Sequence, residues 1–300
     1  MNTLAIIIPY YKIIFFEETL NSIANQTNKK FNLYIFDDDS PEDPKSLIDQ
    51  FIDQLNISYK KFDVNFGGQS LVKHWYRCLE NITEDWFCIL GDDDILDTNF
   101  VNSFYNNIDT VNEQKINLIR YSSVVINDKG KEITPTYHHP ILENSIDSLV
   151  RKLKGNNRSS LSEFIYRNVS NRNNHFIDFP NAYYSDDLSL LLASNFAQIF
   201  SINTSVFKFR KGNYNLSGVN SDLKKGFEAE FLFYKYLFNN HSLQFNIEQK
   251  RLFLHKLNRL VIRTKSLKIY LFMIKQAIKI YDISAIFYLS KVVVKKLIFH

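Results

Sequence analysis

Three adjacent aspartates, Asp92 to Asp94, follow the apolar run Trp86 to Leu90 after a single glycine, Gly91. Carboxylates this close repel one another, and burying them without a partner is costly. A divalent cation would offset the repulsion, because carboxylate oxygens are the hard ligands that Mg²⁺ and Mn²⁺ prefer. Such a cation usually bridges one or two carboxylates to phosphates, and it can act as a Lewis acid toward a departing diphosphate. The triplet therefore predicts a metal site that binds the phosphates of a ligand.

A second acidic cluster, Asp37 to Asp39, ends another strand-like run, Phe31 to Phe36. Pro9 and Tyr11 stand at the end of a third apolar run. In open α/β sheets, ligands bind beyond the carboxyl ends of the strands. Two acidic clusters at one such edge favour a ligand site over an ordinary solvated surface.

The pair Asp186–Asp187 precedes an apolar helical segment. Carboxylates in the first turn of a helix are stabilised by the helix dipole, so the pair alone is typical of an ordinary helix start. A catalytic role for the pair depends on further evidence from the rest of the chain.

The first hundred residues alternate apolar strand-like runs with amphipathic helical segments. We expect strands at 4–11, 31–40, 57–64 and 85–94, and helices at 16–27, 40–55 and 67–82. This alternation predicts an α/β fold with a Rossmann-like, mostly parallel central sheet flanked by helices. The run 57–64 is the weakest of the four strands, and we expect it nearer an edge of the sheet.

Beyond residue 100 the pattern is mixed. Strands are expected at 117–128, at 159–167 and from 199 onward, and the chain reads as helical from Glu228 to its end. Residues 249–300 hold 12 Lys/Arg and one acidic residue, a net charge of +11 within a total of +4. These cations either form the solvent-exposed face of terminal helices packed on the body of the protein or contact an anionic membrane surface, as basic amphipathic helices do.

The bulk composition, 45% hydrophobic and 23% charged, suits a globular chain with a substantial core. Leu4 to Ile8 is too short for a secretory signal, and no uncharged stretch reaches the roughly 18 residues that span a bilayer. We therefore expect a cytoplasmic protein, with 249–300 as the candidate for peripheral contact with the inner face of the plasma membrane. Nucleic acid is not an expected partner, because the basic charge is confined to the tail and no nucleic-acid motif appears.

Taken together, these pieces resemble a known family. The runs "IIIPYY", "EETLNSIANQT", "YIFDDDSPED", "NFGG" and "WFCILGDDDIL" follow the order and spacing of the nucleotide-binding half of a family 2 glycosyltransferase with the GT-A fold. The pieces "YYSDD" and "FRKGNYNLSG" are similar to later landmarks of that family. The resemblance implies a GT-A domain over 1–225, whose nucleotide-binding half spans about 1–100 and whose acceptor half spans about 101–225. A basic, amphipathic helical region would follow at 226–300.

The resemblance also implies roles for individual residues. Asp92 and Asp94 would be the outer carboxylates of a DXD-type motif that binds Mg²⁺ or Mn²⁺. Asp187, with Asp186 before it, would stand where the family has its catalytic base, and Arg210 would lie near the diphosphate or the acceptor. The residues expected to bind the nucleotide sugar are Pro9, Tyr11, Asp37, Asp38, Asn65, Gly67, Asp93 and Arg210.

The implied reaction is a metal-dependent single displacement that inverts the anomeric carbon. The donor would be a nucleotide-diphosphate sugar, with a UDP-sugar as the first choice. The acceptor would be a hydroxyl of a glycan or of a lipid-linked acceptor in bacterial polysaccharide biosynthesis. A base would deprotonate that hydroxyl while the metal and nearby cations stabilise the leaving diphosphate.

The chain departs from the family pattern at three positions. Asp39 stands where the family commonly has Gly, Gly91 where it often has Asp, and Asp186 where it often has Glu. The change at Gly91 shifts the register of the motif. The residues therefore leave open which two of the three aspartates face the metal.

Two other functions stay open at this point. A phosphohydrolase of the haloacid dehalogenase type would use Asp37 and Asp39 after a strand, but it wants Thr or Val where this chain has Pro41. A non-catalytic nucleotide-sugar binder is the other alternative. The second acidic cluster and the pair Asp186–Asp187 argue against it.

Overall fold

A computed structural model of the chain describes residues 2–169, 175–212 and 222–281. The chain divides into two compact units, each described here by itself. The first holds Met1–Asp178 and Ser185–Ser221, and the second holds Phe179–Tyr184 and Asp222–His300.

The first unit contains the sheet and its helices. Its strands are β1 (Leu4–Tyr10), β2 (Asn32–Asp37), β3 (Ile57–Lys61), β4 (Trp86–Ile89), β5 (Ile95–Leu96), β6 (Leu118–Ile126), β7 (Leu142–Asn144), β8 (Phe164–Arg167) and β9 (Gln198–Arg210). Its helices are α1 (Phe16–Ala24), α2 (Lys45–Ile48), α3 (Leu71–Leu79), α4 (Phe100–Glu113), α5 (Ser145–Leu153), α6 (Ser185–Ala193) and the 3₁₀ turn η1 (Leu161–Glu163).

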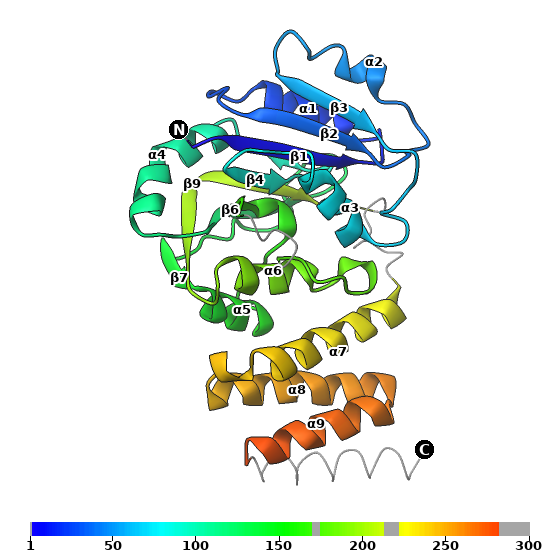
Figure 1. The fold of residues 1–300 in the computed structure, drawn as a ribbon, viewed down its shortest axis with the longest axis vertical. Helices are drawn as coiled ribbons and strands as arrows, with labels where there is room; N and C mark the ends of the chain where they lie inside the picture. Colours follow the sequence, from blue (N-terminus) through cyan, green and yellow to red (C-terminus); the bar gives the residue numbers. More distant parts are fainter. Residues whose placement is uncertain (1, 170–174, 213–221, 282–300) are drawn as a thin grey trace. The chain divides into compact units, whose positions relative to one another are not determined.

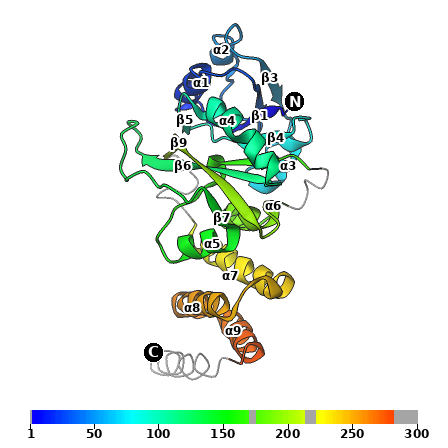
Figure 2. The same cartoon turned by 90° about the vertical axis from the view of Figure 1, so that its left-hand side faces the viewer.

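The strands form one sheet in the order β3-β2-β1-β4-β8-β6-β9-β5, with β7 pairing to β9. Figure 1 shows β3, β2, β1 and β4 side by side, and all their pairings are parallel. The second half is mixed, because β8 runs antiparallel to both β4 and β6. Strands β6 and β9, both labelled in Figure 2, pair in parallel. The expected α/β fold is confirmed, and β3 lies at the sheet edge as expected.

The chain order reverses direction across the sheet between β1 and β4. From β1 the chain moves outward through β2 to β3, and it then returns to the other side of β1 as β4. Such a reversal leaves a crevice beyond the carboxyl ends of the two central strands, where open α/β sheets bind ligands. Tyr11 and Asp92 follow β1 and β4 at this point.

Strand β1 lies at the buried centre of the sheet. Alternate residues of a strand point to opposite faces, and Ile6 and Ile8 belong to one core cluster. The same cluster contains Phe16 and Leu20 of α1 and Phe104 of α4. Burial of these side chains fixes the backbone of β1, and with it the position of the loop that follows.

The segment 40–55 differs most from its predicted structure. Only Lys45–Ile48 forms a helix, and residues 49–54 form turns. Phe51 and Leu55 are still buried, whereas Ile52 is 56% exposed. Packing of individual side chains against the core does not require a continuous helix, so tertiary contacts override the amphipathic pattern here.

Helices α4 and α5 have no counterpart in the sequence prediction. Helix α4 is rich in Asn, Ser and Thr, whose side chains compete for backbone hydrogen bonds and weaken helix propensity. It forms because Phe100, Phe104 and Val111 bury one side of it. Helix α5 begins at Asn144, whose side chain accepts a hydrogen bond from the Ile146 N–H at 2.8 Å.

The second unit is built from the 3₁₀ turns η3 (Pro180–Ala182) and η4 (Ser242–Gln244) and the helices α7 (Leu223–Asn240), α8 (Ile247–Thr264) and α9 (Leu267–Lys279). Aromatic contacts join the helices. The ring centres of Phe231 of α7 and Phe272 of α9 lie 5.5 Å apart, and those of Tyr234 of α7 and Phe253 of α8 lie 5.6 Å apart. Helical structure from residue 228 is confirmed as far as 279, with breaks between the helices. Residues 282–300 of the expected helical region lie outside the described residues. Within residues 2–169, 175–212 and 222–281, no helix combines the length and apolarity needed to cross a membrane.

Candidate active site

The carboxylate of Asp92 joins the ends of the two central strands. Its Oδ2 accepts hydrogen bonds from the backbone N–H groups of Tyr11 and Lys12, both at 2.8 Å. Burial raises the pKa of Asp92, while these two hydrogen bonds oppose the rise. One oxygen of this predicted metal ligand is therefore engaged in holding the loop after β1.

Asp93 and Asp94 point their carboxylates toward the same place above Gly91. Asp93 Oδ1 and Asp94 Oδ2 each lie 2.9 Å from the position that a Cβ on Gly91 would occupy. Burial, followed by the charge of Asp94, raises the pKa of Asp93 to about 8. Burial raises the pKa of Asp94 to about 6. A side chain at residue 91 would fill the space in which the two carboxylates converge.

Arg210 supports the triplet Asp92–Asp94 through hydrogen bonds to Asp93 and Asp94. Its backbone N–H donates to Asp94 Oδ1 at 2.9 Å, and its Nε donates to the Asp93 carbonyl oxygen at 2.8 Å. A terminal nitrogen donates to Glu18 at 2.6 Å, and the guanidinium lies 4.2 Å from the ring centre of Phe15. The Arg210 side chain is fully buried. These contacts support the backbone of the triplet, and they leave no exposed surface of Arg210 on which a diphosphate could bind.

The carboxylate oxygens above Gly91 fit a divalent cation such as Mg²⁺. Among the residues that the structure describes, no three His, Cys, Asp or Glu side chains are grouped to hold a metal. Mg²⁺ seldom needs such a cage, because it usually takes one or two carboxylates together with water and substrate phosphates. Two hard carboxylates with raised pKa values, next to an edge where phosphates would lie, meet that requirement. Asp93 and Asp94 are the residues that would hold the ion.

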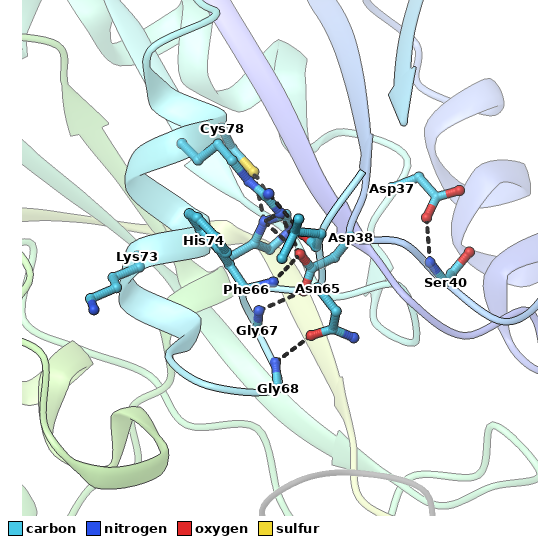
Figure 3. A network of polar contacts seen from close by, with 12 residues as sticks. Asp37, Asp38, Ser40, Asn65, Phe66, Gly67, Gly68, Lys73, His74 and Cys78 are labelled. Atoms are coloured by element: carbon cyan, nitrogen blue, oxygen red, sulfur yellow. Dashed lines mark hydrogen bonds and ion pairs between the residues drawn. The ribbon is translucent and has the colours of Figure 1, made fainter. Parts of the chain in front are cut away.

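Asp38 organises the loop Asn65–Gly68 (Figure 3). Its Oδ1 accepts from the Phe66 N–H at 2.8 Å and its Oδ2 from the Gly67 N–H at 2.6 Å. Asn65 Oδ1 in turn accepts from the Gly68 N–H at 2.5 Å. A Cβ on Gly67 would lie only 2.5 Å from Asp38 Oδ2, so glycine is required for this close approach.

Asp37 has both oxygens engaged within the protein. Oδ1 accepts from the Ser40 N–H at 2.7 Å and Oδ2 from the Tyr59 hydroxyl at 2.8 Å, and the residue is fully buried. The following residue, Asp39, has a left-handed backbone with φ of 54°. This conformation explains why a glycine is common there in the family and why Asp, which tolerates it less well, marks a departure.

Pro9 and Tyr11 flank the same edge. Pro9 is the penultimate residue of β1, opposite Phe36 of β2. Tyr11 is 40% exposed, so the residue is accessible to a ligand. Their placement beside Asp38 is compatible with a nucleoside lying across the strand ends.

Arg77 is a residue that the sequence reasoning missed. From α3 it binds the Asp38 carboxylate and donates to the Val64 carbonyl oxygen at 2.9 Å. Its guanidinium stacks on the rings of Phe62 and Phe66, at 3.7 and 4.4 Å from their centres. The signal in the sequence is one of two cations, Lys73 and Arg77, on α3 after the "NFGG" loop, and this pattern is too common to be diagnostic. Contact with Asp38, 39 residues away, reveals its role.

Asp186 and Asp187 begin helix α6 and have different surroundings. Lys152 of α5 makes an ion pair with Asp187 and donates to the Ser159 carbonyl oxygen at 3.1 Å. Burial lowers the pKa of Lys152, but Asp187 and Asp186 outweigh that effect, and the net pKa is raised. Burial, followed by the charge of Asp187, raises the pKa of Asp186 to about 6. The Asp187 carboxylate is therefore ion-paired, and the pKa of the Asp186 carboxyl lies well above that of an ordinary aspartate.

Arg158 and Glu163 were not identified from the sequence. Arg158 acts electrostatically on Asp94 of the triplet, and Glu163 acts on Lys152, the partner of Asp187. Arg158 lies 3.4 Å from Glu163 and 4.1 Å from the ring centre of Phe209. Its charge opposes the rise that burial causes in the pKa of Asp94. Burial raises the pKa of Glu163 to about 7, while the charges of Arg158 and Lys152 oppose the rise. Part of the Arg158 side chain, 17%, is exposed, so it is an accessible cation beside the triplet.

Comparisons with known proteins bear on the family and the fold of the chain. The sequence pattern of glycosyl transferase family 2 matches residues 5–190 of the chain. No curated protein matches the chain significantly. The crystal structure of S. aureus TarS 1–349 in complex with UDP-GlcNAc is similar in fold, with a TM-score of 0.66 at 16% identity over 90% of this chain and 76% of that one. The complex of the same protein with UDP gives 0.59 at 17% identity, over 90% and 75%.

The family match covers more than half of the chain and includes both acidic strand ends and the start of α6. The structural likeness, at this low identity, shows the fold alone. Together they confirm the expected family and fold, and they leave the phosphohydrolase and binder alternatives without support. The chain belongs to glycosyl transferase family 2, and the protein is a glycosyltransferase.

Proposed function

We propose that this glycosyltransferase transfers a sugar from UDP-sugar to a hydroxyl of a glycan or lipid-linked acceptor, with inversion of the anomeric carbon. The observation that carries the proposal is the reversal of strand order between β1 and β4, where Asp92 joins the strand ends and Asp93 and Asp94 converge. The similar TarS structures, whose complexes contain UDP-GlcNAc and UDP, support a uridine nucleotide as donor.

The residues beside β2 would bind the nucleoside. Asp38 holds the loop Asn65–Gly68 against the strand end, so the loop is preorganised before the donor arrives. The exposed ring of Tyr11 offers a surface for the nucleoside from the other side. Asp37 acts through the turn that its hydrogen bond with the Ser40 N–H stabilises, and Pro9 would lie along the nucleoside.

The diphosphate would lie beside Asp93 and Asp94. A divalent cation bound by these carboxylates would supply Lewis-acid stabilisation of the leaving diphosphate. Arg158 adds a positive charge on the same side, because it is partly exposed and within electrostatic reach of Asp94. Arg210 contributes indirectly, by fixing the backbone of the triplet.

The pair at the start of α6 would supply the base. The resemblance puts the base at Asp187, but Lys152 holds that carboxylate as an ion pair. Asp186, with a pKa of about 6, combines the ionised form at neutral pH with useful basicity. We assign proton acceptance from the acceptor hydroxyl to Asp186 and the orientation of the pair to Asp187 and Lys152.

We further propose that the protein works in bacterial polysaccharide biosynthesis, in the cytoplasm and at the inner face of the plasma membrane. The net charge of +11 in residues 249–300 supports contact with an anionic surface. A membrane-bound acceptor would be consistent with that location.

Incubation with Mn²⁺ and a panel of nucleotide sugars, with and without glycan acceptors, tests this function. We expect release of UDP from a UDP-sugar, stimulated by acceptor, and a product whose anomeric configuration by NMR is opposite to that of the donor. Binding of nucleotide sugars without turnover under any condition would instead identify a binder.

Substitution of Gly67 by alanine is expected to weaken UDP binding and to lower the free energy of unfolding by about 1–3 kcal/mol. The new Cβ would lie 2.5 Å from Asp38 Oδ2, which displaces the loop from its anchor. Calorimetric titration with UDP and thermal unfolding measure the two effects. Gly226→Ala is the matched control, because its Cβ meets nothing closer than 3.9 Å and UDP binding should be unchanged. Undiminished UDP affinity in Gly67→Ala would contradict the proposed role of the loop.

A further inference from the structure

Helix α9 exposes a stripe of aliphatic side chains. Leu267, Leu271 and Ile278 are 63%, 58% and 56% exposed. At 100° per residue, positions four and seven apart lie on one side of a helix. The opposite side of α9 packs into its unit through Met273 and Ala277, which are fully buried. The exposed stripe is therefore a separate face, distinct from the one that holds the helix in place.

Cations run beside this stripe. Lys268, Lys275 and Lys279 of α9 are exposed and lie about a quarter turn from the aliphatic side chains. From residue 249 to residue 281 the chain has nine Lys/Arg and no Asp or Glu. The helix thus presents hydrocarbon and positive charge side by side, with no carboxylate in its own sequence or in the preceding part of α8 from 249 onward.

We propose that the α9 face, formed by Leu267, Leu271, Ile278, Lys268, Lys275 and Lys279, binds the surface of an anionic lipid bilayer. The aliphatic side chains would enter the boundary between headgroups and acyl chains, while the lysines contact anionic headgroups. This inference deepens the membrane contact proposed above by naming its surface. It is tested by binding alone, so its failure can be distinguished from failure of the proposed reaction.

The chemistry of the face favours a bilayer over other anionic partners. A nucleic acid would engage the lysines but would leave the aliphatic stripe exposed to water. A second copy of the chain could bury the stripes against each other. That pairing would bring the flanking lysines of the two copies together, and like charges placed opposite each other are unfavourable. A bilayer satisfies both parts of the face at once.

Flotation of the full chain with lipid vesicles tests the proposal. We expect binding to vesicles that contain phosphatidylglycerol, weak binding to pure phosphatidylcholine vesicles, and a loss of binding as salt rises. The triple variant Lys268→Gln, Lys275→Gln, Lys279→Gln should bind roughly 100-fold more weakly, since each surface lysine contributes about a factor of five. The variant Leu267→Ser, Leu271→Ser should lose binding by about tenfold or more, even though its net charge is unchanged.

Two control variants match these changes elsewhere in the chain. Leu243→Ser removes an aliphatic side chain that is 99% exposed but lies outside α9, in η4. The triple variant Lys30→Gln, Lys129→Gln, Lys131→Gln removes three exposed charges from the other unit. Both controls should keep the vesicle binding of the parent protein, because neither touches the α9 face.

Several results would overturn the proposal. One is equal flotation of the parent protein and the α9 lysine variant. Another is a loss of vesicle binding in the Lys30, Lys129 and Lys131 variant that is as large as the loss in the α9 lysine variant. A third is RNA binding in the absence of vesicle binding. Sedimentation provides a fourth: a dimer that dissociates in Leu267→Ser, Leu271→Ser, in a protein that does not bind vesicles, would assign the stripe to a second copy.

Discussion

Replacement of Asp186 by Asn is expected to lower kcat for sugar transfer by about 10²–10⁴-fold, the usual contribution of a general base. The carboxyl of Asp186 has a pKa of about 6, raised by burial and by the charge of Asp187. It is therefore mostly ionised at neutral pH and basic enough to take a proton from a hydroxyl in the transition state. Donor affinity should change little, because the substitution preserves shape and the nucleotide loop lies elsewhere in the unit.

The pH profile of kcat supplies the sharper test. A base works only when deprotonated, so the rate of the parent protein should fall as pH drops below about 6. Asp187→Asn removes a negative neighbour and should move this limb to lower pH. Lys152→Met removes a positive neighbour and should move it to higher pH. If Asp187→Asn abolished turnover while Asp186→Asn kept it, the two aspartates would have exchanged roles.

Replacement of Asp93 by Asn is expected to lower metal-dependent turnover by about 10²–10³-fold and to raise the Mn²⁺ concentration needed for half-maximal rate. Asp93 Oδ1 and Asp94 Oδ2 converge above Gly91, and each loses an anionic oxygen on conversion to the amide. Asp94→Asn should show the same metal dependence. Steady-state rates over a range of Mn²⁺ concentrations measure the effect.

Asp92→Asn serves as the matched control in the same triplet. The asparagine carbonyl can still accept the hydrogen bonds of Tyr11 and Lys12, so the join between β1 and β4 is kept. We expect the smallest change in metal requirement for this variant. Full metal-dependent turnover in all three variants would show that the triplet does not hold the metal.

Much of the fold was predictable because its signals are local. Apolar runs such as Leu4 to Ile8 identify buried parallel strands from their immediate neighbours, and the alternation with helices implies the sheet. Helix α4 escaped prediction because its formation depends on burial of Phe100 and Phe104, which outweighs weak local propensity. The predicted helix 40–55 failed for the converse reason, since Phe51 and Leu55 reach the core from turns.

The sequence could predict which strand ends carry the candidate site residues, but not the contacts of those residues. The acidic strand ends had to meet at one edge of a parallel sheet, which is a consequence of topology that the strand pattern already implies. Which atoms they contact depends on residues far away in the chain. Lys152 is 35 residues from Asp187, and Arg210 is 116 residues from Asp94. No local pattern specifies such pairs.

The sequence by itself determined that acidic clusters would end buried strands and that the chain belongs with nucleotide-sugar transferases. The tertiary structure decided how the aspartates divide their work: Asp92 holds a loop, Asp93 and Asp94 converge above Gly91, and Asp186 titrates beside an ion-paired Asp187. The physical reason is that strand burial follows from short-range periodicity. Ionisation and hydrogen bonding depend on which distant groups the packed core brings within a few ångströms.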